Sequence, residues 1–132
     1  MNGSALFDTN VITKMLKDDS EATFLFKRTR FCYTSTVVAG ELYYAAINSG
    51  KPDKNLQLFR NVLSSMKVIP ITNAVAYIFA EIKLSLKKKG KPIPENDIWI
   101  AATAKAYLLP LATFDNHFSE IPEIELIGIQ KI

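Results

Sequence analysis

The sequence predicts an α/β fold built on a mostly parallel sheet of about four to five strands. Short apolar segments typical of buried strands alternate along the chain with longer segments in which apolar residues recur at helical spacing. The length of 132 residues suits a single compact domain over residues 1–132, and a hydrophobic content of 48% is enough to form its core.

In the first part of the chain, segments expected to be strands each precede segments expected to be helices. Residues 4–9 (SALFDT) form a short apolar run that ends at an acid and a threonine, which is typical of a buried strand. Residues 10–19 and 21–30 carry apolar side chains at helical spacing, and the second ends in basic residues that suit the helix dipole. Residues 30–35 (RFCYTS) favour a strand, and residues 36–50 a helix that its final glycine can close.

The second part of the chain continues this alternation. Residues 52–66 predict an amphipathic helix with proline in its first turn, and residues 67–71 (KVIPI) predict a strand. Residues 72–90 form the longest helical pattern, which begins at a threonine or asparagine cap and ends at a glycine. Residues 94–109 are rich in alanine, which favours another helix, and residues 110–115 (PLATFD) favour a strand.

The chain is expected to finish with a turn and a strand. Residues 116–121 (NHFSEI) predict the turn, with Phe118 packed inward, and residues 124–129 (IELIGI) predict the strand. His117, the only histidine, lies in this turn. We expect it to be a turn residue and not a general base, because NHF is most simply explained as a turn whose Phe118 packs inward.

Four carboxylates fall where the strands end, which is the edge at which parallel sheets bind ligands. Asp8 and Asp115 end strand segments, while Glu41 and Asp97 lie near the starts of helices. Each could simply cap a helix, form a turn or suit a helix dipole. Brought together, however, they would repel one another unless a cation lay between them. Oxygen ligands suit Mg²⁺ or Mn²⁺, whereas one cysteine and one histidine cannot supply the usual ligands of zinc.

Charge and cysteine content narrow the classes of protein to consider. The net charge is +3, from 16 Lys and Arg against 13 Asp and Glu, and the single cysteine cannot form an internal disulfide. No segment has the roughly 18 consecutive apolar residues of a membrane helix, and the first residues lack a signal-peptide pattern. We therefore expect a cytoplasmic protein with no membrane partner.

Three blocks occur along the chain in the order LFDTN, VVAGELYYAAINS and PIPENDIWIAATAKAYLLPLATFDNHFSEIPEIELI. They resemble the PIN-domain nucleases, most closely the VapC-type toxins of type II toxin–antitoxin systems. The resemblance implies a single PIN domain with a three-layer α/β/α fold. It also implies a metal-dependent, single-strand-specific endoribonuclease that hydrolyses phosphodiester bonds of tRNA or rRNA. The implied partners are an RNA substrate, a cognate antitoxin and a second copy of the chain in a homodimer.

The same resemblance implies which residues form the active site. The metal-binding and catalytic acids of the family fall on Asp8, Glu41, Asp97 and Asp115, with Mg²⁺ or Mn²⁺ as the cofactor. Positions that commonly carry a small polar residue beside the metal fall on Asn10 and Thr113.

The chain departs from the family pattern in two places. Tyr44 and Ala45 stand where many relatives have a glycine, and Asn116 and His117 stand where some relatives have a further acid. The first difference should affect packing, and the second bears on how a second metal ion would be held.

Basic residues are candidates to bind the RNA backbone. These are Lys14, Lys87, Lys88 and Lys89. A solvated helix end is the simpler explanation of the lysine run in KKKGK.

Two other functions compete with the nuclease hypothesis. One is a PIN-like module that binds RNA or protein without cutting it. The other is a haloacid-dehalogenase-like phosphatase, which also starts from an aspartate after the first strand. Such phosphatases need a second aspartate two positions further on, where this chain has Asn10.

Overall fold

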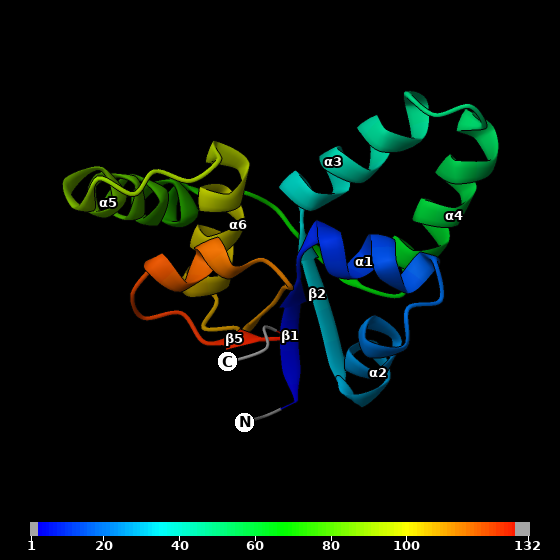
Figure 1. Ribbon diagram of the computed structural model, residues 1–132, viewed down its shortest axis with the longest axis horizontal. Helices are drawn as coiled ribbons and strands as arrows, with labels where there is room; N and C mark the ends of the chain where they lie inside the picture. The colour runs from blue at the N-terminus through cyan, green and yellow to red at the C-terminus, as the bar shows by residue number, and fades with distance from the viewer. Residues whose placement is uncertain (1–2, 129–132) are drawn as a thin grey trace.

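The computed structural model describes residues 3–128 and shows a five-stranded sheet whose strand pairs are all parallel (Figure 1). The strand order is β3-β2-β1-β4-β5, which places the first strand at the centre. The strands are β1 (Ser4–Phe7), β2 (Phe31–Ser35), β3 (Lys67–Ile69), β4 (Leu111–Ala112) and β5 (Leu126–Ile127). The predicted parallel α/β architecture is confirmed. The last residue of the predicted segment 124–129 lies outside the described residues.

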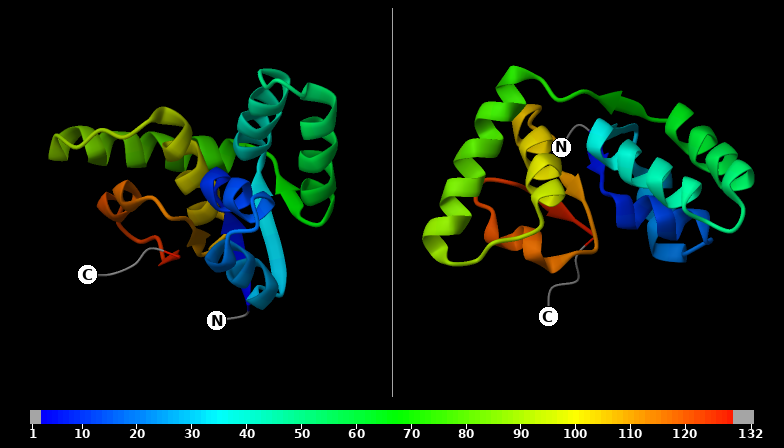
Figure 2. Two further views of the ribbon diagram at one scale, coloured as in Figure 1. Left: turned by 45° about the vertical axis from the view of Figure 1, so that its right-hand side comes forward. Right: turned by 90° about the horizontal axis from the view of Figure 1, so that it is seen from above.

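Helices cover both faces of the sheet, which gives the three layers of an α/β/α fold. Figures 1 and 2 show α1 to α4 on one side of the sheet, with α5 and α6 on the other. The helices are α1 (Thr9–Leu16), α2 (Ser20–Arg28), α3 (Thr36–Ile47), α4 (Pro52–Ser64), α5 (Asn73–Lys89) and α6 (Glu95–Ala106). A 3₁₀ helix, η1 (Asn116–Glu120), replaces the predicted turn, and its Phe118 is fully buried as expected.

The side chains of the central strand are buried on both faces of the sheet. Leu6 and Phe7 of β1 are both completely buried, although alternate side chains of a strand point to opposite faces. The register places Leu6 opposite Leu111 of β4, and the backbone N–H of Asp8 donates to the Ala112 carbonyl at 2.9 Å. The ends of β1 and β4 are thereby held level with each other, which positions the acid that follows each of them.

Helix ends follow the predicted signals with one correction. Gly90 adopts a left-handed conformation with φ 68° and ends α5, as its position predicts. The expected closure of α3 at Gly50 is wrong, because α3 already ends at Ile47 with Asn48 as its cap. The Asn48 N–H donates to the Tyr44 carbonyl, so this backbone group is satisfied without a glycine. Over the described part of the chain, no helix combines the length and hydropathy that a membrane crossing requires.

Candidate active site

Asp8 lies at the end of the central strand and begins helix α1. Its Oδ1 accepts the Thr9 N–H at 2.8 Å as an N-terminal cap, and its Oδ2 accepts the Thr113 hydroxyl at 2.8 Å. The residue is only 4% exposed. Burial raises the pKa of this carboxyl to about 6, although both hydrogen bonds favour the charged form and oppose the shift. The nearby charges of Asp97 and Glu41 raise the pKa further.

Glu41 projects from the middle of α3 and is held by two neighbours. The Thr9 hydroxyl donates to its Oε1 at 2.5 Å, and the Asn96 amide donates to its Oε2 at 3.5 Å. Thr9 therefore contacts two of the predicted acids, Asp8 through its backbone N–H and Glu41 through its hydroxyl. The sequence interpretation missed Thr9 and Asn96. The only signal in the sequence was that each directly adjoins an acid, in DTN and END.

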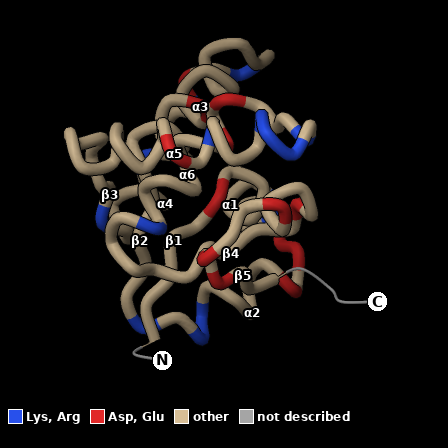
Figure 3. Tube along the Cα trace, turned by 90° about the vertical axis from the view of Figure 1, so that its left-hand side faces the viewer, with Lys and Arg blue, Asp and Glu red and all other residues tan. Residues whose placement is uncertain are grey.

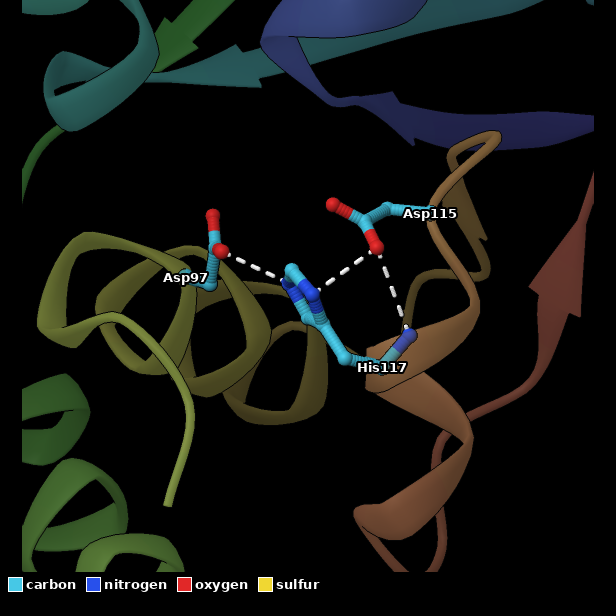
Figure 4. Close-up of side chains that lie close together, drawn as sticks. All are labelled: Asp97, Asp115 and His117. Carbon is cyan, nitrogen blue, oxygen red and sulfur yellow. Dashed lines mark hydrogen bonds and ion pairs between the residues drawn. The ribbon is translucent and has the colours of Figure 1, made fainter.

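Asp97 and Asp115 lie on either side of His117 (Figure 4). His117 Nε2 is 2.7 Å from Oδ2 of Asp97, and His117 Nδ1 is 2.8 Å from Oδ1 of Asp115. Partial burial raises the pKa of the Asp97 carboxyl, and its hydrogen bond to His117 partly offsets this effect. The expectation that His117 is only a turn residue is therefore incomplete. η1 packs Phe118 into the core, and this turns the preceding side chain toward the two acids.

Asn10 and Thr113 connect the carboxylates on the two strands. The Asn10 amide donates to the Thr113 hydroxyl oxygen at 3.4 Å, and its Oδ1 accepts the Phe114 N–H at 3.3 Å. The Thr113 oxygen also accepts the Asp115 N–H at 3.1 Å. These polar residues therefore lie beside the acids and fix the loop after β4 relative to the start of α1.

The predicted basic residues lie in two different places. Lys14 is exposed, with its Nζ 5.0 Å from the centre of the Phe114 ring, one residue before Asp115. Figure 3 shows the lysine run 87–89 as a continuous blue segment at the end of α5. Lys89 of that run donates to the Glu120 carbonyl at 2.6 Å, so it ties α5 to the end of η1. Lys87 and Lys88 are exposed.

A cavity of about 540 Å³ lies beside Glu41, between α3 and the start of α6. It is lined by Thr36, Val37, Gly40, Glu41, Tyr44 and Asn96. The Glu41 carboxylate on its wall gives a ligand in this cavity direct access to one of the four acids.

The donor atoms of the site suit a divalent cation. Carboxylate oxygens converge from β1, α3, α6 and the loop after β4, and oxygen ligands are those that Mg²⁺ and Mn²⁺ prefer. Within residues 3–128, the group whose ligand atoms all lie within 4.8 Å of one another is Asp97, Asp115 and His117. Asp8 and Glu41 lie close enough to act on each other electrostatically but outside that tight group.

Comparisons with known proteins agree with this architecture. The family model of the PIN domain matches residues 5–124. Ribonuclease VapC2 of Haemophilus influenzae is 35% identical over 104 residues, covering 76% of this chain and 78% of the relative. The tRNA(fMet)-specific endonuclease VapC of Salmonella typhimurium is 28% identical over 125 residues, covering 92% of this chain and 94% of the relative. The structure of VapBC2 from Rickettsia felis, bound to a DNA fragment of its promoter, superposes with a TM-score of 0.86 at 25% identity, covering 93% and 96% of the two chains. The chain therefore belongs to the PIN-domain family, among its VapC-type members.

Proposed function

We propose that this protein is a divalent-metal-dependent, single-strand-specific endoribonuclease of the VapC type that a cognate antitoxin inhibits. The observation that carries the proposal is the convergence of Asp8, Glu41, Asp97 and Asp115 at one edge of a PIN-domain sheet. Burial raises the pKa of two of them, so the folded protein holds these acids in a setting that a bound cation would relieve.

The named relatives support the substrate class and the partner. The Haemophilus influenzae and Salmonella typhimurium relatives are ribonucleases, and the second is specific for tRNA(fMet). We therefore propose tRNA as the first substrate class to test, with rRNA as the second. The Rickettsia felis neighbour is a VapBC complex, which supports a small antitoxin protein as the partner. Both partners would meet this protein in the cytoplasm.

The four carboxylates are the residues that would hold Mg²⁺ or Mn²⁺. Such an ion, when bound, supplies a nucleophile by lowering the pKa of water and polarises the phosphate. The protein's own contribution is to orient the carboxylates before substrate arrives. Thr113 fixes Asp8, and Thr9 fixes Glu41, each through a hydroxyl that donates to one carboxylate oxygen.

The remaining groups would bind the RNA chain and the protein partners. Lys14 is exposed beside the loop that carries Asp115, where its ammonium can contact an RNA phosphate. Lys87 and Lys88 are available for the same purpose at the end of α5. Tyr44 and Ile47 of α3 are 69% and 64% exposed, and they offer an apolar surface for the antitoxin or a second copy of the chain.

A cleavage assay tests the proposal. Untagged protein is incubated with total tRNA or a single-stranded RNA oligonucleotide in Mg²⁺, in Mn²⁺ and in EDTA. We expect cleavage only with a divalent ion, and its loss in Asp8→Asn and Asp97→Asn proteins that remain folded. Asp53→Asn, which changes an exposed acid in the first turn of α4, is the matched control. The proposal is wrong if both active-site variants cleave RNA at the wild-type rate, or if the wild-type protein keeps full activity in EDTA.

A further inference from the structure

The position of His117 suggests a role that oxygen ligands alone do not describe. It is the only histidine in the chain, and both of its ring nitrogens lie within 2.8 Å of a carboxylate oxygen. Asp115 contacts it twice, because the same Oδ1 that lies near Nδ1 also accepts the His117 backbone N–H at 3.4 Å. The acid and the imidazole therefore form one local unit.

The hydrogen atoms of the imidazole explain why this arrangement suits a cation. A neutral ring has one N–H, and donation from Nδ1 to Asp115 leaves a lone pair on Nε2. Nε2 lies 2.7 Å from Oδ2 of Asp97, so without a cation this contact is a hydrogen bond only if Nε2 also carries a proton. Two electron-rich atoms at this separation need a proton or a metal ion between them. A carboxylate that accepts the second ring N–H is also the usual neighbour of a histidine that binds metal.

We propose that His117 is a nitrogen ligand of the catalytic cation, with Nε2 and Asp97 binding the ion. Oδ1 of Asp115 orients the imidazole through Nδ1–H, and its other carboxylate oxygen can still bind the ion. This inference rests on the proposed nuclease function and specifies its metal. Mg²⁺ prefers oxygen ligands, whereas imidazole favours transition metals. The site is therefore built for Mn²⁺ in preference to Mg²⁺.

The backbone of η1 and the side chains beside His117 fix the orientation of the imidazole. His117 lies in η1, and the adjoining Phe118 is completely buried, with its ring centre 5.0 Å from that of the imidazole. Asp115 caps the same 3₁₀ helix, so the orienting carboxylate and the ligand move together. A ligand that is preorganised in this way costs little conformational entropy when the ion binds.

Pulsed electron paramagnetic resonance of bound Mn²⁺ tests the inference directly. The sample is untagged protein freed of metal with EDTA and then loaded with Mn²⁺ alone. Because the chain has one histidine, a ¹⁴N imidazole modulation in the Mn²⁺ echo must come from His117. When only histidine is labelled with ¹⁵N, the ¹⁴N modulation must be replaced by the ¹⁵N pattern. This experiment uses the wild-type sequence, so it remains decisive even if a variant fails to fold.

Calorimetry adds a measurement of metal preference. Wild-type protein should bind Mn²⁺ about tenfold or more tightly than Mg²⁺. His117→Asp, which offers oxygen in place of nitrogen, should narrow this ratio, and His117→Asn should lose the ¹⁴N modulation. Ser119→Ala, which changes an exposed residue of the same 3₁₀ helix, is the control, and it should keep the ¹⁴N modulation and the preference for Mn²⁺.

The outcomes separate this inference from the proposed function. Mn²⁺ binding without a histidine modulation in the wild-type protein would overturn the nitrogen ligand and leave the metal-dependent nuclease standing. Equal affinity for Mg²⁺ and Mn²⁺ in the wild-type protein would overturn the predicted preference. Failure of the wild-type protein to bind either ion would reject both the inference and the metal dependence of the proposed function.

Discussion

The hydroxyl of Thr113 donates a 2.8 Å hydrogen bond to Oδ2 of Asp8, joining residues that are 105 positions apart in the sequence. Both side chains are buried, and each follows a strand at the centre of the sheet. This bond opposes the effect of burial, because it favours the charged form of a carboxyl whose pKa burial raises. The active site is thus stabilised by a few polar contacts that let an acid remain inside the protein.

Replacing Thr113 with valine removes that donor while keeping a similar shape. We expect Thr113→Val to lower the free energy of unfolding at pH 7.5 by about 1–3 kcal/mol, because a buried carboxylate loses its partner. The pKa of Asp8 should rise at the same time. Urea unfolding measures the first effect, and Thr113→Ser, which retains the hydroxyl, is the control. Equal stability of the serine and valine variants would mean that the bond does not matter.

The raised pKa of Asp8 predicts how stability depends on pH. The carboxyl has a pKa of about 6 in the folded protein, above its ordinary value of 3.8, so the folded state holds more protons than the unfolded chain between these values. Its contribution to the free energy of unfolding is present in full below pH 3.8 and is lost as the pH rises through about 6. The difference corresponds to roughly 3 kcal/mol.

The variant Asp8→Asn tests this pH dependence, since asparagine keeps the helix cap but does not titrate. We expect wild-type stability to fall relative to the variant between pH 4 and pH 7.5, measured by urea unfolding in EDTA. The pKa of Asp97 is also raised by burial, and this acid is present in both proteins. Because the charges of Asp8 and Asp97 act on each other, the difference between the two proteins reports the titration of Asp8 together with this coupling. Parallel stability profiles for the two proteins would contradict the prediction.

Thr9 should matter for catalysis more than for stability. Its hydroxyl donates a 2.5 Å hydrogen bond to Glu41. Its backbone N–H donates to Asp8, and this second bond is kept in any substitution at this position except proline. We expect Thr9→Val to reduce the cleavage rate by about tenfold to a hundredfold through misplacement of Glu41. The free energy of unfolding should change by less than about 1 kcal/mol. Thr9→Ser should retain activity, and a valine variant as active as wild type would remove Thr9 from the site.

Much of the fold could be predicted because it depends on local patterns. The run SALFDT, an apolar segment that ends at an acid and a threonine, already indicates a buried strand with an acid at its carboxyl end. The glycine that closes α5 also acts through its own backbone conformation, and so could be located. These features need no information about which distant segments meet.

The contacts inside the site could not be predicted in the same way. Thr9 meets Glu41 across 32 positions, and Asp97 meets His117 across 20. Each contact depends on how two helices lie on the sheet, which hydrophobic periodicity does not specify. The contacts of His117 with the two acids could not be predicted, because the pattern identifies Phe118 as buried but gives no direction for its neighbour on a 3₁₀ helix.

Gly128 has no side chain, but its backbone conformation and packing should contribute to the stability of the site. Its φ is +99°, a conformation that other residues rarely adopt. A Cβ at this position would lie 2.8 Å from the Thr113 carbonyl oxygen and 3.1 Å from Cδ1 of Leu25. Gly128 therefore packs directly against Thr113, which follows β4.

We expect Gly128→Ala to lower the free energy of unfolding by at least about 1–3 kcal/mol, from backbone strain and the displacement of Thr113. Gly50→Ala is the matched control, because no atom lies within 4 Å of a Cβ there. Urea unfolding of the two variants measures the difference. The displacement should also weaken the bond from Thr113 to Asp8, so the pH dependence of stability should change in Gly128→Ala and not in Gly50→Ala. Equal behaviour of the two alanine variants would show that the contact at Gly128 yields without disturbing Thr113.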